Sequence, residues 1–563
     1  MKNSEIADLL DRTALLLEAV GENRFKIVAF RRAAKNVRNL SEDIEDVWNT
    51  GGLEQLPGIG KGIAKKIDEY IRTGKITYLQ KLENQVPQAA IDLMAIPGIG
   101  PRTAFKLTKE HGIQNIDSLR EAIQNGSLDD FFGPTIRKKI ISEIEMIKST
   151  SKRMLLPQAE EIAGSIVEYL KAGGIHIIIA GSIRRCKATV GDIDAIALDE
   201  NAVELLSKFP HTSKVLSRGT KKASFILDNG VQVDVRISEK DELGATLLYF
   251  TGSKDHSIAL RNIAISKGYK LNEYGLFDES SGKLIASGSE EGIYKALGMQ
   301  YIEPELREDR GEIQAALQGR LPNLLRKGSL KGDLQMHTLW SDGLSTIEQM
   351  AREAKLLGYE YIAITDHSKS ARLANGLNED RFLRQWKEID ALNEKMSPFT
   401  ILKGVEVEIK GDGSLDLEAD FLNSFDVVGI SMHQGYNQSP EKLTQRMIKA
   451  MGSKRVHYLC HPTNRLIGIR GGHEINMERI IQEAKDRGIM IEINSQPNRL
   501  DIDEVWARKA AEEGVDLVIN SDAHSTEELT YVRYGENVAR RAWLESKNVI
   551  NTLSLNQLLR RLS

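Results

Sequence analysis

The chain has 563 residues, of which 41% are hydrophobic, and a formal net charge of −4. This length exceeds the size at which single cores stop growing, so three or more domains are expected, and the slight acidity excludes a polycation that coats nucleic acid along its whole surface. Only Cys186 and Cys460 occur, the first residues lack signal-peptide features and no apolar run is long, which predicts a soluble cytoplasmic protein with neither disulfides nor a membrane partner.

The first 150 residues are predicted to form helices interrupted by two copies of one glycine turn. Leu-Pro-Gly-Ile-Gly at 56–60 precedes a helix expected over 61–71, and Ile-Pro-Gly-Ile-Gly at 96–100 precedes a helix expected over 101–109. The glycines permit a tight hairpin whose backbone N–H groups can bind a phosphate. One such turn would more often be an ordinary helix connection. The pair resembles helix-hairpin-helix modules, which hold the DNA backbone without reading sequence, and this implies DNA contacts for Gly58, Gly60, Gly98 and Gly100.

A basic run between Glu22 and Glu42 contains no acidic residue; its members are Arg24, Lys26, Arg31, Arg32, Lys35 and Arg38. Such a run is usually a solvated helix face, but beside a hairpin motif we favour a phosphate-binding surface. In the helix after the first hairpin, isoleucines at 63, 67 and 71 mark the buried stripe. A turn of 100° per residue then places Lys66 at the edge of this stripe and directs Lys65 outward.

Two aspartates one residue apart, Asp192 and Asp194, follow a Gly-Ser turn and several basic residues. Side chains alternate along a strand, so both carboxylates are predicted to lie on one face. Two like charges so close favour a cation, and a site made of carboxylates suits Mg²⁺ that carries a polyphosphate. The pair therefore indicates nucleotidyl transfer, although a lone Asp-x-Asp is more often a solvated strand end.

A third carboxylate is predicted on a half-buried strand over 231–236, where the valines share one face and Asp234 lies on the other. Three such carboxylates hold two metal ions roughly 3.5–4 Å apart in two-metal sites. Asp234 is therefore expected beside Asp192 and Asp194.

These segments and the sequence Tyr-Phe-Thr-Gly-Ser at 249–253 together resemble family X DNA polymerases. The resemblance implies addition of dNTPs to gapped or nicked DNA with Mg²⁺ or Mn²⁺. Asp192, Asp194 and Asp234 would be the catalytic metal ligands, and Asp234 the base for the primer hydroxyl. The nucleotide-binding residues it implies are Gly181, Ser182, Arg185, Gly191, Tyr249, Phe250 and Gly252.

The same resemblance places Arg261 in the template minor groove. Lys66 matches a lysine that relatives use as the Schiff-base nucleophile of a 5′-deoxyribose-phosphate lyase, a chemistry that requires a depressed lysine pKa. Lys254 and Ser257 stand where eukaryotic relatives carry Asp and Asn near the incoming base, so fidelity and nucleotide affinity are not carried over.

From residue 332 on, seven short apolar strands separated by helical stretches end in polar residues. This pattern predicts a barrel of parallel strands with its active site at their carboxyl ends. Five of the 11 histidines lie there, together with Glu406 and Asp522. This convergence predicts a multinuclear metal centre, and mixed imidazole and carboxylate ligands suit Mn²⁺, Zn²⁺ or Fe²⁺ better than Mg²⁺.

The order of these motifs resembles the polymerase and histidinol phosphatase (PHP) domain, a family of phosphoesterases with three clustered metals. The resemblance implies three ligand sets: His337, Glu406 and Asp522; Glu406, His433 and His461; and Asp342, His367 and His524. Gln335 departs from the family, which has histidine there, and an amide is a poorer ligand. Asp366 is open to two interpretations, an orienting residue for a ligand or an ordinary structural residue. His457 and His473 match no ligand position and are predicted to be structural.

The resemblances cover nearly the whole chain and imply an α-helical helix-hairpin-helix N-terminal region, an α/β nucleotidyltransferase palm with a thumb, and a C-terminal (β/α)7 PHP barrel. The expected parts are a lyase-like domain at 1–85, fingers with the second hairpin at 86–150, the palm at 151–240, the thumb at 241–315, a linker at 316–332 and the PHP domain at 333–563. This is the arrangement of a bacterial family X DNA polymerase.

We therefore expect a monomer that fills gaps in base excision repair and carries a metal-dependent 3′–5′ exonuclease, with AP endonuclease or 3′-phosphatase activity also open. The alternative is a PHP phosphoesterase joined to a DNA-binding polymerase-like module with weak catalysis. The three intact palm carboxylates weigh against this alternative.

Overall fold

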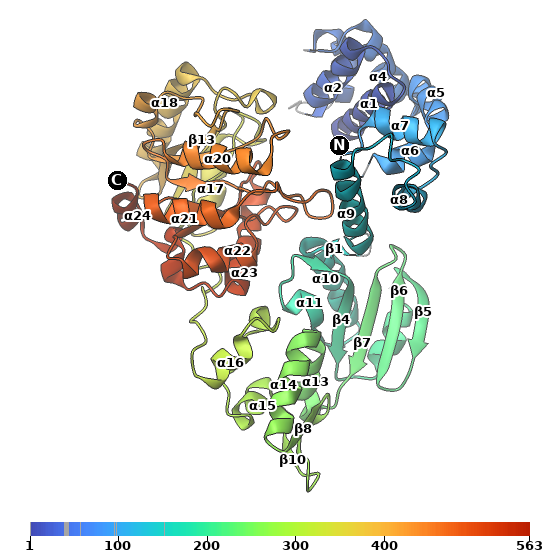
Figure 1. Ribbon diagram of the computed structural model, residues 1–563, viewed down its shortest axis with the longest axis vertical. Helices are drawn as coiled ribbons and strands as arrows, with labels where there is room; N and C mark the ends of the chain where they lie inside the picture. The colour runs from blue at the N-terminus through green and yellow to red at the C-terminus, as the bar shows by residue number, and fades with distance from the viewer. Residues whose placement is uncertain (1, 39–43, 57, 95, 97, 151–152) are drawn as a thin grey trace. The chain divides into compact units, whose positions relative to one another are not determined.

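The computed structural model describes the chain except residues 1, 39–43, 57, 95, 97 and 151–152, and for some helix residues it describes the backbone alone. The chain divides into two compact units (Figure 1). Residues 1–151 with 468–471 make up the first, and residues 152–467 with 472–563 the second. Within the described ranges, no helix combines the length and the apolarity that crossing a membrane requires.

The first unit is α-helical, and its helices share one hydrophobic core that extends from Ile6 to Ile144. The two helices expected after the glycine turns are confirmed as α4 and α7, each of which begins directly after the second glycine of its turn. The elements of this unit are α1 (Lys2–Ala19), α2 (Arg24–Arg38), α3 (Ile44–Asn49), η1 (Leu53–Gln55), α4 (Lys61–Thr73), α5 (Thr77–Gln85), α6 (Gln88–Leu93), α7 (Pro101–Glu110), α8 (Ile116–Gln124) and α9 (Pro134–Thr150).

The second unit begins with a five-stranded mixed sheet of order β2-β4-β7-β6-β5. Figure 1 labels β4, β7, β6 and β5 of this sheet. Only β4 and β7 pair in parallel within it. Along β7 buried and half-buried residues alternate, as the valine pattern predicts. The elements here are β1 (Met154–Leu155), α10 (Leu156–Ala172), β2 (Ile177–Ile179), α11 (Gly181–Arg184), β3 (Thr189–Val190), β4 (Asp192–Ala197), α12 (Asn201–Ser207), β5 (Thr212–Arg218), β6 (Lys222–Leu227) and β7 (Gln232–Ile237).

A helical layer with a three-stranded antiparallel sheet, order β10-β9-β8, follows. Residues 318–331 then lead to the last part without a helix or strand. The elements are η2 (Lys240–Glu242), α13 (Leu243–Thr251), α14 (Lys254–Ser266), β8 (Tyr269–Asn272), β9 (Gly275–Asp278), β10 (Leu284–Ala286), α15 (Glu290–Ala296), η3 (Pro304–Leu306) and α16 (Glu312–Leu317).

Seven parallel strands follow one another in chain order, which confirms the predicted (β/α)7 barrel. The ends of the sheet meet, because residues beyond β11 and β17 form a parallel bridge, Met336 with Ala523. The strands are β11 (Gly332–Asp333), β12 (Tyr361–Ile364), β13 (Thr400–Glu408), β14 (Val427–Ser431), β15 (Tyr458–Leu459), β16 (Met490–Asn494) and β17 (Leu517–Asn520).

Helices cover the outside of this barrel (Figure 1), and most barrel strands are buried throughout, as parallel strands between layers are. The helices are α17 (Ile347–Leu356), η4 (Arg372–Ala374), α18 (Glu379–Met396), α19 (Ala419–Leu422), α20 (Pro440–Met451), α21 (Met477–Arg487), α22 (Glu504–Glu512), η5 (Glu527–Tyr531), α23 (Val532–Arg541), η6 (Ser546–Asn548), η7 (Ile550–Thr552) and α24 (Leu555–Leu562).

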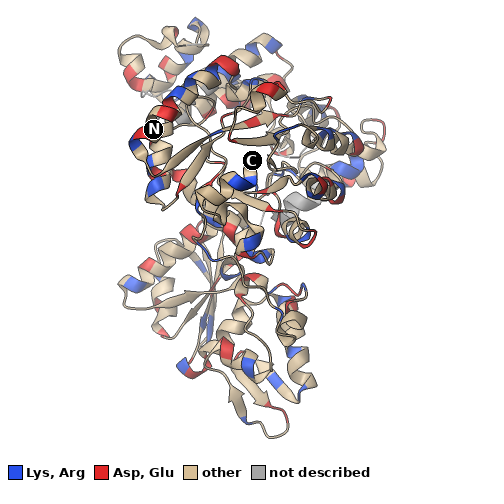
Figure 2. Cartoon of the chain, turned by 90° about the vertical axis from the view of Figure 1, so that its left-hand side faces the viewer, with Lys and Arg blue, Asp and Glu red and all other residues tan. Residues whose placement is uncertain are grey.

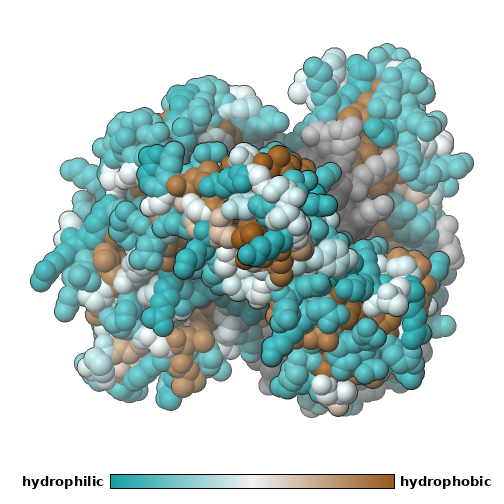
Figure 3. All heavy atoms as spheres, turned by 90° about the horizontal axis from the view of Figure 1, so that it is seen from below, coloured by the Kyte–Doolittle hydropathy of each residue, from teal (hydrophilic) through white to brown (hydrophobic). Residues whose placement is uncertain are grey.

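Figure 2 shows basic and acidic residues interspersed along the helices and strands, which agrees with the small net charge. The face shown in Figure 3 is mostly hydrophilic with scattered apolar groups. Any binding of a polyanion must therefore come from local geometry and not from overall charge.

Candidate active sites

Strands β4 and β7 bring the three predicted carboxylates together. The parallel register pairs Asp194 with Asp234, and ligand oxygens of Asp192, Asp194 and Asp234 lie within 4.8 Å of one another. Ile193, between the first two, is fully buried on the opposite face. The pKa of Asp194 is raised to about 7, mainly because the side chain is buried and further because Asp192 and Asp234 carry negative charge nearby. Such a cluster of like charges is stabilised by a divalent cation with oxygen ligands.

The Gly-Ser turn before β4 packs directly on this cluster. Gly181 has φ +59°, and a Cβ there would lie 2.0 Å from Oδ2 of Asp194, so only glycine fits. The adjoining pocket has a volume of about 370 Å³. It is lined by Arg153, Gly181, Ser182, Arg185, Asp192, Asp194, Tyr249, Phe250, Gly252, Lys254, Ser257 and Arg261.

Arg153 is a pocket residue that the sequence prediction missed. Its guanidinium donates hydrogen bonds to the hydroxyl and the carbonyl oxygen of Thr189, at 3.0 and 2.5 Å. A Cβ on Gly191 would lie 3.0 Å from its Nη1, so this predicted glycine, which directly precedes Asp192, borders Arg153. Arg153 belongs to no motif, and only the pairing of β1 with β3 brings it to the pocket.

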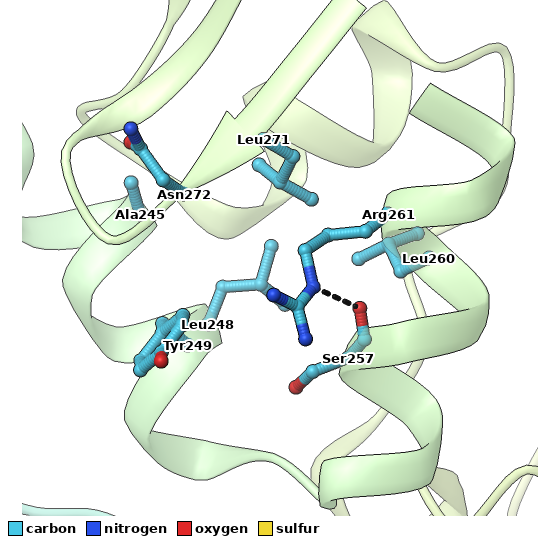
Figure 4. A pocket seen from close by; sticks show the side chains of 8 residues that line it. All are labelled: Ala245, Leu248, Tyr249, Ser257, Leu260, Arg261, Leu271 and Asn272. Carbon is cyan, nitrogen blue, oxygen red and sulfur yellow. Dashed lines mark hydrogen bonds between the residues drawn. The ribbon is translucent and has the colours of Figure 1, made fainter. Parts of the chain in front are cut away.

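Tyr249 and Arg261 come from consecutive helices, α13 and α14. Gly252 ends α13, and the Ser253 hydroxyl accepts a hydrogen bond from the His256 N–H in the first turn of α14. Figure 4 shows the Arg261 side chain turned back toward Ser257, whose carbonyl oxygen accepts a hydrogen bond from Nε at 3.2 Å. Both departures from the eukaryotic pattern, Lys254 and Ser257, line the same pocket.

The two hairpins have matching backbones. Gly58 and Gly98 have φ of +76° and +94°, and Gly60 and Gly100 are helix N-caps without a side-chain cap, so the first N–H groups of α4 and α7 have no capping side chain. A Cβ on Gly58 would lie 3.0 Å from the Arg32 side chain, so basic helix α2 packs beside the first hairpin. Two motif residues, Pro57 and Pro97, and the side chains of Lys35 and Arg38 lie outside the described part of the chain.

Lys66 lies beside two aromatic rings and is half-buried as predicted, while Lys65 is exposed. Its Nζ is 4.7 Å from the Tyr78 ring centroid and 5.8 Å from that of Phe30. Burial and the nearby charge of Lys26 lower the pKa of Lys66. This is the direction that an amine nucleophile requires.

At the carboxyl ends of the barrel strands, the predicted ligands form three overlapping groups. His337, Glu406 and Asp522 make one group, as predicted. Asp342, His367 and His524 make another, which also includes His337. The third joins Glu406 and His433 with His367, where His461 was predicted; His461 nevertheless lies close, with Nε2 at 3.1 Å from Glu406 Oε1.

Neighbouring polar groups orient these ligands. Nδ1 of His433 lies 3.0 Å from Glu408, and Asn494 donates to Oδ2 of Asp522 at 3.0 Å. Such contacts fix ring orientation and tautomer. Asp366 instead accepts hydrogen bonds from Thr338, Ser341 and Gln385, and so holds the segment that leads to Asp342. His457 bonds the backbone of Val428 and Leu562 through its two ring nitrogens, in keeping with a structural residue.

The barrel residues fit a cation. Nδ1 of His337, Nδ1 of His461 and Oε2 of Glu406 are buried without a hydrogen-bond partner, as are both amide atoms of Gln335. Burial lowers the pKa of His337, but its hydrogen bond to Asp522 and the nearby carboxylates outweigh this and raise it to about 10. The carboxylates gathered at this site therefore need positive charge close by. Metal ions bound by these imidazole and carboxylate donors supply it.

Four segments of the chain match known families: residues 1–76 a helix-hairpin-helix domain, 90–145 a SAM-like helix-hairpin-helix tandem, 246–308 the DNA polymerase beta thumb and 333–496 the PHP domain. Over 99% of its length the chain is 38% identical to the DNA polymerase/3′-5′ exonuclease PolX of Bacillus subtilis (strain 168), of which it covers 98%. The chain belongs to the bacterial family X DNA polymerases.

Two further relatives of this family X polymerase match parts of it. DNA polymerase lambda of Arabidopsis thaliana is 26% identical over 54% of the chain and 62% of its own length. A probable phosphatase of Thermoanaerobacter sp. (strain X514) is 31% identical over 39% of the chain and 89% of its own length. The predicted fold class and enzyme class are confirmed: the chain is a DNA polymerase with a PHP exonuclease domain, and it uses DNA, dNTPs and divalent metal ions.

Proposed function

We propose that the palm adds deoxynucleotides to a primer end in short DNA gaps, with Asp192, Asp194 and Asp234 as ligands of two ions, Mg²⁺ or Mn²⁺. The observation that carries the proposal is the in-register pairing of Asp194 with Asp234 beside a cation-lined pocket. Bound there, two such ions neutralise the transferring phosphate and lower the pKa of the attacking hydroxyl.

The chain's own residues then bind and orient the substrates. Asp234 accepts the proton of the primer 3′-hydroxyl. Ser182, Arg185 and the backbone at Gly181 and Gly191 hold the triphosphate, because a Gly-Ser turn at a helix start and a guanidinium both donate to phosphate oxygens. Tyr249, Phe250 and Gly252 border the sugar, and Arg261 reaches the template minor groove once it leaves Ser257. These four residues line the same pocket as Ser182 and Arg185.

The hairpins support gapped DNA as the substrate and base excision repair as the setting. Two glycine turns of like backbone hold phosphates on either side of an interruption, through Gly58 and Gly60 and through Gly98 and Gly100. Lys66 supports a lyase step on a 5′-deoxyribose phosphate, because its lowered pKa increases the free amine. We propose that a monomer carries out these steps.

The barrel hydrolyses phosphoesters at 3′ ends in this proposal, so that mispaired or blocked ends are removed before synthesis. His337, Asp342, His367, Glu406, His433, His461, Asp522 and His524 would hold up to three ions of Mn²⁺, Zn²⁺ or Fe²⁺. AP endonuclease and 3′-phosphatase activities are further candidates, and the similarity to a probable phosphatase favours the second.

A one-nucleotide gap tests the proposal. A labelled primer is followed for extension and for shortening, with Mg²⁺ and with Mn²⁺, on gapped, nicked and recessed duplexes. We expect extension to be fastest on the gap with a 5′-phosphate. Equal rates on the gap and on the recessed end would refute the gap preference, and absence of extension would favour the alternative of a nuclease with a weak polymerase-like module.

A further inference from the structure

Helix α23 belongs to the PHP barrel, yet it carries several ionic contacts to the polymerase part of the same unit. It packs against β16 and β17 on one side. From it, Arg533 contacts Glu160 at 3.0 Å, Arg540 contacts Glu305 at 2.9 Å and Arg541 contacts Glu308 at 3.1 Å. The hydrophobic core of the barrel also continues into Leu156, Ala159 and Val190 of the palm. The two parts therefore pack as one body at this junction.

Arg541 is the contact that lies deepest, with only 2% of its side chain exposed. Its Nη1 donates to the backbone carbonyl of Arg185 at 2.8 Å and to Oε1 of Glu308 at 3.1 Å. Its Nη2 donates to Glu504, the first residue of α22, at 2.8 Å. One buried guanidinium thus joins two barrel helices to the nucleotide-binding turn of the palm.

The side chain of Arg185 depends on the same carboxylate. Its Nε donates to Oε1 of Glu308 at 3.0 Å, and its Nη1 donates to the carbonyl oxygen of Thr251. Arg185 also lines the nucleotide pocket, so these two bonds orient the guanidinium while an edge of it remains for a ligand. A guanidinium whose orientation is already fixed loses little conformational entropy when it binds a phosphate.

Glu308 is an ionised anchor in this arrangement. Burial alone would raise its pKa, but Arg541, Lys187 and Arg185 outweigh burial and lower it. If fewer cations surrounded Glu308, this buried carboxylate would attract the Arg185 guanidinium more strongly and hold it away from the pocket. Arg541 shares the carboxylate and at the same time holds the backbone of Arg185.

We propose that Arg541 of the PHP barrel is a positioning residue of the polymerase site, which sets the backbone and the carboxylate partner of Arg185 so that its guanidinium meets the triphosphate. The nuclease domain thereby contributes to the nucleotide affinity of the polymerase. This inference rests on the proposed role of Arg185 in triphosphate binding.

Steady-state gap filling by the full chain tests it, with Arg541→Gln, Arg541→Lys and Arg185→Gln as variants. We expect Arg541→Gln to raise KM for dNTP about tenfold, which is about 1.4 kcal/mol of binding free energy, with a much smaller change in kcat. Arg541→Lys should recover part of the lost dNTP affinity, because the lysine ammonium keeps the positive charge but not the several hydrogen bonds of the guanidinium. The matched control is Arg540→Gln, on the same helix, whose partners are Glu305 and Leu325; its KM should stay within about twofold of the parent.

The outcomes separate the inference from the function on which it rests. If Arg185→Gln leaves KM unchanged, the role of Arg185 fails. If Arg185→Gln raises KM and Arg541→Gln does not, the role of Arg541 fails. A parallel fall of kcat and exonuclease rate in Arg541→Gln, without rescue by lysine, also overturns it.

Should Arg541→Gln not fold, as its melting curve would reveal, Glu308→Gln provides a second test. This substitution removes the carboxylate that Arg185 and Arg541 share, so it should also raise KM for dNTP. An unchanged KM in the folded Glu308→Gln variant overturns the proposal.

Discussion

Protonation of Asp194 should control the Mg²⁺ requirement of the polymerase between pH 6 and pH 8. Burial and the charges of Asp192 and Asp234 raise its pKa to about 7. A carboxyl group must lose its proton to bind a metal, so the apparent dissociation constant rises about tenfold for each pH unit below that pKa. The constant should therefore be about elevenfold above its limiting value at pH 6 and only about 1.1-fold above it at pH 8.

The assay is single-turnover incorporation into a one-nucleotide gap at saturating dNTP, with Mg²⁺ titrated at several pH values. The maximal rate also depends on deprotonation of the primer hydroxyl, so the informative quantity is the Mg²⁺ concentration that gives half of the maximal rate. We expect this concentration to fall about tenfold from pH 6 to pH 8.

A neighbouring cation supplies a matched perturbation. Lys222 lies 3.4 Å from Asp234 and its charge lowers the pKa of Asp194, so Lys222→Met should move the transition to higher pH. Lys221→Met is the control, because Lys221 contacts Glu242 instead, at 3.9 Å. A half-saturating Mg²⁺ concentration that is flat between pH 6 and pH 8, or equal shifts in the two lysine variants, would refute the reasoning.

Three further predictions concern the separate sites. Asp192→Asn or Asp194→Asn should reduce incorporation at least about a thousandfold and leave 3′ shortening intact, whereas His337→Ala or Asp522→Asn should do the reverse; loss of both activities in one variant would contradict separate centres. Lys66→Ala should abolish the borohydride-trapped adduct with 5′-deoxyribose-phosphate DNA, while Lys65→Ala should not. Because the pKa of Lys66 is lowered, trapping should rise with pH and level off below the range of a free lysine, and continued increase beyond pH 10 would argue against it. Glu408→Gln should weaken metal-dependent exonuclease activity about 10- to 100-fold through His433, with recovery at high Mn²⁺; normal activity at limiting Mn²⁺ would exclude an orienting role.

Local patterns predicted the palm because its determinants are short in sequence. Alternation with period two places Asp192 and Asp194 on one face, and the valine pattern identifies the strand of Asp234. The register of Asp194 with Asp234 is a property of the sheet, and it brings the three expected carboxylates together. The need for glycine at 181 follows only from the structure, where Asp194 occupies the space of a side chain.

Contacts between distant segments could not be predicted in the same way. Arg153 lies in no motif, and Arg541 meets Arg185 across 356 positions in sequence. Residues 316–332 have the composition of a linker, but Leu325 is fully buried and its carbonyl oxygen accepts a hydrogen bond from Arg540. Composition reports the polarity of a segment, whereas burial depends on which surface the segment meets.

The two candidate metal centres differ in donor chemistry as well as in place. The palm offers only carboxylates, whose hard oxygen donors suit Mg²⁺, while the barrel combines Asp342, Glu406 and Asp522 with imidazoles that favour transition metals. Mn²⁺ suits both donor sets, whereas Mg²⁺ suits the carboxylates of the palm better than the imidazoles of the barrel. We therefore expect Mg²⁺ to sustain synthesis without activating the barrel, and removal of nucleotides to depend on the supply of a transition metal.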